Sequence, residues 1–326
     1  FYILFNLLWS VAFAMNVSYF HPVINHTEID LVNSHNETWT AGVNSFMLDK
    51  TMEDIRRLCG TRLDDYNFLD EHIVNVSYEE LYSDVDFPAS FDARSKWPTS
   101  IHPIRNQKHC GSCWAFSAAE VLSDRFSIAS NGRIQTVLSP EDLVSCDKSN
   151  MGCRGGRLPA AWEYMKDTGI VSDDCFPYTS GNGTTAECVT KCSDSESFMK
   201  SKHKAKNYYR LASVEDIQRE ILLHGPVQTG FRVYKSFMSY TSGVYQRNWW
   251  KFWDPIMGGH AVKIVGWGTY TDEDKPLSRP VDYWTVANSW DTTWGEEGYF
   301  KIKKGVNMCG IESGVYAGLP DIEQEQ

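Results

Sequence analysis

A short segment, residues 107–116, places a carboxamide, a cysteine and a helix-forming run within ten residues. Cys113 is followed by Trp-Ala-Phe-Ser-Ala-Ala-Glu, which favours a helix that begins at or near the cysteine. Unpaired amides and the helix dipole at such a position favour a thiolate over a thiol. The side chain of Gln107, brought close by the intervening turn, can donate a hydrogen bond to a developing oxyanion. The chemistry indicated is nucleophilic attack by sulfur on a carbonyl carbon.

Such a nucleophile needs a partner that carries its proton, and two downstream segments supply one. His260 precedes alternating apolar residues that predict a strand, which would hold the imidazole rigidly. The amide oxygen of Asn288 can accept the imidazole N–H and fix the ring, and Trp290 can shield that bond from water. His260 follows Cys113 by 147 residues and Asn288 follows it by 175.

Other interpretations of these residues stay open at this point. Cys110-Gly-Ser-Cys113 is also a C-x-x-C motif, which suits a redox pair or half of a zinc site. No second C-x-x-C motif accompanies it. Alone, His260 would more often be a core histidine and Asn288 an ordinary strand-end amide, but their joint occurrence favours catalysis. A protein whose cleft only captures peptides is a further alternative, which alkylation of the thiol would separate from an enzyme.

The elements that must position these residues differ between the two halves of the chain. Ser139 before Pro140 is a helix N-cap signal in a helix-rich first half. From about Tyr208 the pattern favours strands separated by glycine-rich turns. Helices are expected after Cys113, after Ser139, near 158–167, and near 214–223, where Gly225-Pro226 follows. We expect an α+β fold whose cleft has the cysteine on one wall and the histidine and asparagine on the other.

Composition and charge narrow the class of protein. The chain has 326 residues, nine cysteines and 42% hydrophobic residues, and it contains five N-x-[ST] sequons, which together indicate an oxidising, glycosylating route. The sequons are at Asn16, Asn25, Asn36, Asn75 and Asn182. Residues 15–86 hold 14 acidic against 4 basic residues, whereas residues 87–326 hold 28 against 27. No repeat, low-complexity tract or nucleic-acid-binding pattern is found.

The same motifs resemble the papain family of cysteine proteases, specifically its cathepsin B branch. Further matching stretches are Pro88-Ala-Ser-Phe-Asp-Ala-Arg94, Cys153-Arg-Gly-Gly156, Ser242-Gly-Val-Tyr-Gln246 and Cys309-Gly-Ile-Glu-Ser313. Upstream, Trp39-Thr-Ala-Gly42 and Leu58-Cys-Gly-Thr61 resemble the short cathepsin B propeptide. The resemblance covers roughly residues 39–320.

The resemblance implies a papain-like fold with a helical left subdomain and an antiparallel, β-barrel-like right subdomain. Residues 1–14, apolar and ending in Ala12-Phe-Ala14, are expected to be a truncated signal peptide, too short for the ~20 residues of a membrane span. An inhibitory propeptide is expected over 15–84, with a helix around 46–58 and residues 58–60 blocking the cleft. The mature domain is expected over 85–326. Implied disulfides are Cys110–Cys153, Cys146–Cys188 and Cys175–Cys192, which leave Cys59, Cys113 and Cys309 as thiols.

The implied activity is hydrolysis of peptide bonds through a thioester. Gln107 and the Cys113 backbone N–H would stabilise the oxyanion, while Trp290 and Trp294 shield the His–Asn pair and Trp294 shapes the primed side. Gly155 and Gly156 leave backbone free to pair with an extended substrate. No metal or organic cofactor is implied. Expected partners are peptide and protein substrates, the chain's own propeptide and cystatin-type inhibitors, for a monomer in a lysosome or acidic secretory vesicle, or secreted.

Three departures from cathepsin B predict altered specificity. Cathepsin B has a long occluding loop with a histidine pair, but here residues 179–187 are nine short or polar residues without histidine. We therefore expect endopeptidase action with little or no removal of dipeptides. Gly314 replaces an acidic residue of the S2 pocket, which favours an apolar P2 residue. The aromatic stretch 247–255 is expected to be core with some residues at the primed side, and 269–280 is expected to be a surface loop.

The acidic upstream segment suggests a trigger for maturation. Protonating its carboxylates in an acidic compartment would weaken its hold on the enzyme.

Overall fold

The computed structural model describes residues 22–35, 38–63, 75–76, 87–247, 254–271 and 279–323. The α-helices are α2 (His26–His35), α3 (Met52–Leu58), α5 (Ala93–Lys96), α6 (Cys113–Ala129), α7 (Pro140–Cys146), α8 (Leu158–Asp167) and α9 (Val214–His224). The strands are β1 (Trp39–Ala41), β2 (Asn75–Val76), β3 (Phe91–Asp92), β4 (Tyr209–Leu211), β5 (Val227–Tyr234), β6 (Tyr240–Tyr245), β7 (Ile256–Tyr270), β8 (Val281–Ala287), β9 (Tyr299–Lys303) and β10 (Val315–Ala317). Short 3₁₀ segments are η1 (Ser45–Met47), η3 (Gly152–Arg154), η4 (Ser180–Asn182), η5 (Lys235–Ser239) and η6 (Met308–Gly310).

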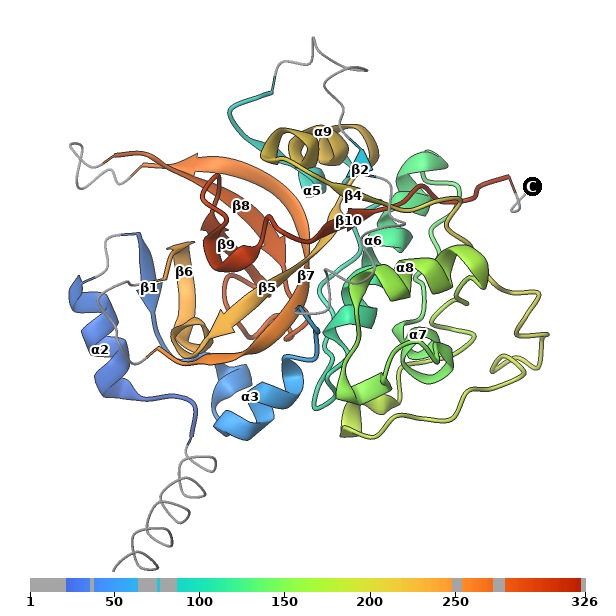
Figure 1. The fold of residues 1–326 in the computed structure, drawn as a ribbon, viewed down its shortest axis with the longest axis horizontal. Helices are drawn as coiled ribbons and strands as arrows, with labels where there is room; N and C mark the ends of the chain where they lie inside the picture. Colours follow the sequence, from blue (N-terminus) through green and yellow to red (C-terminus); the bar gives the residue numbers. More distant parts are fainter. Residues whose placement is uncertain are drawn as a thin grey trace, which may run out of the picture.

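Helices and sheet separate into two parts, as the α+β expectation required. In Figure 1 the helices α6, α7 and α8 gather on the right and the large sheet lies on the left. The helix α6 is the centre of the helical part, because fifteen of its seventeen residues are buried. A helix buried on all sides needs partners for its polar residues. It has them: Arg125 forms an ion pair with Glu220 of α9 at 2.6 Å and donates to three backbone carbonyls.

The sheet runs in the order β1-β6-β9-β8-β7-β5-β10-β4-β2, with β3 paired to β7. Most neighbours are antiparallel, but β6 pairs with β9 and β2 with β4 in parallel. The path has two ends, so the sheet is not closed into a barrel, although its mainly antiparallel character is as expected. The long strand β7 lies between β5 and β8 and carries His260 near its start. The histidine therefore sits on a strand held on both edges.

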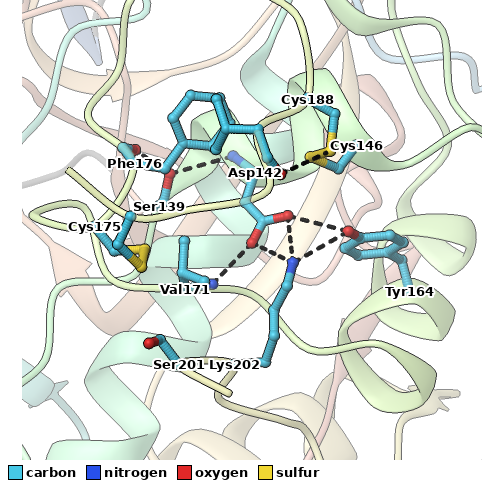
Figure 2. A network of polar contacts seen from close by, with 12 residues as sticks. Ser139, Asp142, Cys146, Tyr164, Val171, Cys175, Phe176, Cys188, Ser201 and Lys202 are labelled. Carbon is cyan, nitrogen blue, oxygen red and sulfur yellow. Dashed lines mark hydrogen bonds and ion pairs between the residues drawn. A yellow bond between two sulfur atoms is a disulfide. The ribbon is translucent and has the colours of Figure 1, made fainter. Parts of the chain in front are cut away.

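A buried polar network fixes the helical part (Figure 2). Ser139 caps α7 by accepting from the Asp142 backbone N–H at 3.2 Å, which confirms the predicted N-cap. The Asp142 carboxylate contacts Lys202 at 2.6 Å and accepts from Tyr164 at 3.1 Å and from the Val171 N–H at 2.9 Å. Burial raises the pKa of Asp142 and lowers that of Lys202, while their mutual attraction opposes both shifts. The pair ties α7 to the chain that leads toward the sheet.

Three further buried contacts join the two walls of the cleft. Lys263 of β7 lies 2.7 Å from Asp124 and 3.8 Å from Glu120, both on α6. Gln228 of β5 donates to the Trp114 carbonyl at 2.9 Å. These contacts connect the helix that carries the cysteine to the strands that flank the histidine. The relative position of Cys113 and His260 is thus set by packed elements rather than by loops.

The upstream segment packs on the sheet as part of its core. Strand β1 adds to β6 with Trp39 opposite Gly243, and α2 and α3 contribute buried residues to the same hydrophobic cluster as the sheet. The helix expected over 46–58 is instead two pieces, η1 and α3. The break lies at Thr51, which starts α3 with a capping box to Asp54. The upstream elements, blue in Figure 1, lie along the sheet and reach the helices at α3.

Some expectations concern residues outside the described ranges. These are the segment 1–14, residues 248–253 of the aromatic stretch and residues 272–278 of the expected surface loop. The boundaries at 14/15 and 84/85 stay predictions. No helix among the described residues is long and apolar enough to cross a membrane.

Candidate active site

Cys113 begins α6, as predicted, and its side chain is fully buried beneath the upstream segment. Burial alone would raise the pKa of the thiol. The nearby charge of His260, the contact with the Thr61 hydroxyl and the Ala261 backbone outweigh burial, so the pKa is lowered from its ordinary value. A lowered pKa is what a cysteine needs in order to react as a thiolate near neutral pH.

His260 is oriented by the asparagine predicted from the sequence. Its Nε2 donates to Asn288 Oδ1 at 2.7 Å, and the same oxygen accepts from the Ser289 N–H at 2.8 Å. Trp290 covers the pair with its ring 4.6 Å from the imidazole. Nδ1 of His260 is buried and has no hydrogen-bond partner among the described residues. Because Nε2 is engaged, Nδ1 is the nitrogen left to exchange a proton with Cys113.

Gln107 already uses its amide as an oxyanion donor would. Its Nε2 donates to the carbonyl of Leu58, in the upstream segment, at 3.0 Å and to the Cys110 carbonyl at 2.8 Å. Its Oε1 accepts from the Ser289 hydroxyl at 2.7 Å, which fixes the direction of the amide. The carbonyl oxygen of Leu58 therefore lies where the predicted oxyanion donor, the Gln107 amide, points.

The upstream segment runs through the cleft as an extended strand. The Gly156 N–H donates to Gly60 O and the Arg62 N–H donates to Gly156 O, both at 2.9 Å. The Thr61 N–H donates to Gly259 O on the opposite wall at 2.9 Å. The Thr61 hydroxyl lies 3.1 Å from the Cys113 sulfur. The segment thus binds both walls and covers the nucleophile, so a substrate can enter only after it leaves.

Three other residues predicted for the site, Gly155, Trp294 and Gly314, lie in different surroundings. Gly155 has φ +110° and lies against Gly60, with an added Cβ only 2.3 Å from the Gly60 carbonyl oxygen. Trp294 is fully buried and packs on Trp290 with ring centroids 5.2 Å apart. Gly314 is buried, and its carbonyl oxygen lies 3.4 Å from the Thr229 hydroxyl. The binding roles of these residues stay predictions.

The cysteines pair as the resemblance implied. Disulfides join Cys110 to Cys153, Cys146 to Cys188 and Cys175 to Cys192, and Cys59, Cys113 and Cys309 are free. Cys110 is therefore bonded to Cys153 rather than to Cys113, which argues against the interpretation of Cys110 and Cys113 as a redox pair. Among the described residues, no group of three or more His, Cys, Asp or Glu side chains could hold a metal ion.

The sequence did not indicate two contributors to the site. Ser289 fixes the Gln107 amide, and Thr61 contacts the nucleophile. Serine and threonine are too common for their type to mark them. The only signal for Ser289 was its position directly after Asn288.

Comparisons with known proteins agree with this geometry. Residues 87–319 match the papain family cysteine protease model, and residues 29–65 match the peptidase family C1 propeptide model. Cathepsin B-like cysteine proteinase 4 of Caenorhabditis elegans is 39% identical over 92% of this chain and 95% of its own length. The solved structure of proCathepsin B S9 from Trypanosoma congolense is 35% identical, with a TM-score of 0.82 over 92% of this chain and 100% of that chain. Procathepsin L2 from the larval midgut of Tenebrio molitor is 28% identical, with a TM-score of 0.74 over 90% of each chain. The chain belongs to the papain family of cysteine proteases and is a cathepsin B-like zymogen that carries its own propeptide.

Proposed function

We propose that the mature enzyme is an endopeptidase that uses Cys113, His260 and Asn288. The Cys113 thiolate attacks the scissile carbonyl carbon and forms a thioester after the tetrahedral intermediate collapses. Gln107 and the Cys113 N–H stabilise the oxyanion of that intermediate. His260 gives a proton to the leaving amine and then takes one from the water that hydrolyses the thioester. The observation that supports this most directly is Gln107 Nε2, which donates to the carbonyl of Leu58 beside the nucleophile.

Endopeptidase action is proposed because the short loop 179–187 is held down on the enzyme body. The Glu141 carboxylate accepts from the backbone N–H groups of Thr179 and Ser180 at 2.8 and 2.9 Å. The His109 N–H donates to Gly181 O at 3.0 Å, and Thr185 Oγ1 accepts from the Cys153 N–H at 2.9 Å. A loop tied at these points has little length left to cover the primed side. Long substrates can then extend through the cleft in both directions.

An apolar residue at P2 is proposed because Gly314 carries no carboxylate. A P2 arginine would find no partner at that position, and burying an unpaired charge costs several kcal/mol. Leucine, valine or an aromatic residue needs no such partner.

The propeptide also suggests where and how the enzyme is activated. We propose activation in a lysosome or acidic secretory vesicle, or after secretion, with cystatin-type inhibitors as further partners. Asp54 is one carboxylate on which strong acid can act: its hydrogen bonds with Thr51 cap the helix that leads into the cleft, and they lower its pKa, so it holds its proton only below about pH 4. The monomeric state and the signal peptide remain predictions.

Cleavage of an internally quenched peptide with Leu or Val at P2 tests the proposal. Acid-matured wild type in reducing agent is compared with Cys113→Ala, and the fragments are identified by mass. We expect internal cuts that the variant does not make. Stepwise release of dipeptides would overturn the endopeptidase assignment, and an uncut peptide together with a thiol inert to an epoxide reagent would overturn the enzyme.

A further inference from the structure

One cation on the cleft wall has no role in the mechanism above. Arg232 of β5 is exposed and lies opposite Gly259 of β7 in the sheet. It lines a cavity of about 360 Å³ together with the propeptide residues that cross the cleft. The remaining lining residues are Thr61, Arg62, Leu63, Ile256, Gly258 and Gly259. Arg232 therefore faces the space that a substrate enters when the propeptide leaves.

The floor and the rim of this cavity differ in chemistry. At the floor, Leu63 packs so closely on Gly259 that an added Cβ would lie 2.7 Å from the leucine Cγ. Ile256 adds a 52% exposed apolar side chain. At the rim, the Arg232 guanidinium lies 3.7 Å from the position that a Cβ on Gly310 would take. Glycine at 310 leaves the space beside the guanidinium free of a side chain.

Nothing among the described residues neutralises Arg232. Among the described residues that line the cavity there is no carboxylate, and the second charged residue there, Arg62, is also a cation. Asp254 lies in the same region, since it and Arg232 both act on the pKa of Cys309, which burial raises to about 12. Asp254 is buried, however, and accepts from the N–H and the hydroxyl of Ser236 at 2.8 and 2.7 Å. An exposed guanidinium beside an open cavity is suited to a carboxylate supplied from outside.

We propose that Arg232 makes the enzyme selective for peptides with an acidic residue at P3, next to the apolar residue at P2. The inference rests on the proposed protease function and extends it. Thr61 lies at the thiol, and the next residue, Arg62, pairs with Gly156 and lines the cavity together with Leu63. The cavity therefore belongs to the half of the cleft that pairs with Gly156. An apolar side chain fills the floor beside Gly259, and the guanidinium at the rim meets the side chain of the neighbouring position.

The test uses the full chain matured in acid, with active enzyme counted by an epoxide reagent. Its substrates are internally quenched peptides that share Leu at P2 and carry Glu or Gln at P3. The assay is run near pH 6, where a peptide glutamate with an ordinary pKa of about 4.3 is ionised. We expect kcat/KM to be about fivefold higher for Glu, the size of a good exposed ion pair. The ratio should fall toward one in about 0.5 M salt, because exposed pairs are screened.

Variants assign the effect to the guanidinium. Arg232→Gln should bring the Glu/Gln ratio to about one, and Arg232→Lys should keep part of the preference. Lys200→Gln, which removes an exposed cation from another surface, should leave the wild-type ratio unchanged. Equal turnover of the two peptides by wild type, a ratio that survives Arg232→Gln, or a carboxylate preference at P2 instead of P3 would each overturn the inference. Because both peptides carry Leu at P2, failure of the proposed function would differ, as neither would be cut.

Discussion

Replacing Gly60 by alanine should release the cleft from its propeptide. A Cβ on Gly60 would lie 2.0 Å from the Gly111 carbonyl oxygen and 2.6 Å from its carbonyl carbon. These are backbone atoms beside the Cys110–Cys153 disulfide, so they have little room to move. The propeptide must move instead, and it then loses the three backbone hydrogen bonds that residues 60–62 make with Gly156 and Gly259. At about 1 kcal/mol each, their loss raises the inhibition constant about 150-fold.

The assay adds isolated propeptide to mature enzyme and measures the inhibition constant, alongside the half-time of zymogen activation at fixed pH. Gly42→Ala is the matched control, because it is the same change in the same propeptide. Its Cβ would meet only the side chain of Thr241, with the nearest atom at 2.8 Å. We expect Gly42→Ala to inhibit nearly as well as wild type. An inhibition constant for Gly60→Ala within about threefold of wild type would refute the steric reasoning.

Three further outcomes are expected. Gln107→Ala should lower kcat about 10²- to 10³-fold with less change in KM, and an unchanged kcat would exclude an oxyanion role. Asp142→Asn should lower the melting temperature by about 10 °C, because removing one partner of a buried ion pair costs about 3–5 kcal/mol. Combining it with Lys202→Met should recover much of the loss. A shift under about 2 °C for Asp142→Asn alone would contradict the prediction. Burial would raise the pKa of Asp54, but its hydrogen bonds with Thr51 lower it overall. The ionised Asp54 side chain therefore stabilises the bound propeptide above about pH 4, and this effect is lost as the pH falls through the lowered pKa. Asp54→Asn should weaken inhibition by the propeptide at pH 6 and make the inhibition constant depend less on pH below that. An unchanged pH profile of inhibition would exclude a role for this carboxylate.

The cysteine, histidine and asparagine that the structure brings together could be singled out because each stands in an informative local setting. Cys113 starts a helix-forming run, and His260 and Asn288 flank or end apolar strands. The N-cap Ser139 was equally local. What could not be predicted depends on distant contacts. The open path of the sheet is set by pairings such as β6 with β9, which alternation along one strand does not reveal.

The secondary structure of the propeptide also differs from what local sequence patterns predict. A helical pattern over 46–58 suggested one helix, but Thr51 and Asp54 form a capping box that starts a new one. Nothing in the sequence distinguishes Arg232 as a binding residue, because a single arginine in a strand is common. Its position beside Gly259 and Gly310 becomes visible only when β5 lies next to β7.

The pH dependence of Cys113 alkylation tests the central claim most directly, because that claim is a thiolate maintained by His260. Wild type and His260→Ala, both freed of propeptide by an added protease, are treated with iodoacetamide across a range of pH. Labelling at Cys113 is read by mass to separate it from Cys309. The account predicts a thiol pKa below the ordinary value in wild type and a clearly higher pKa in His260→Ala, where the charge of the imidazole no longer favours the thiolate. The same pH profile in both proteins would contradict the account.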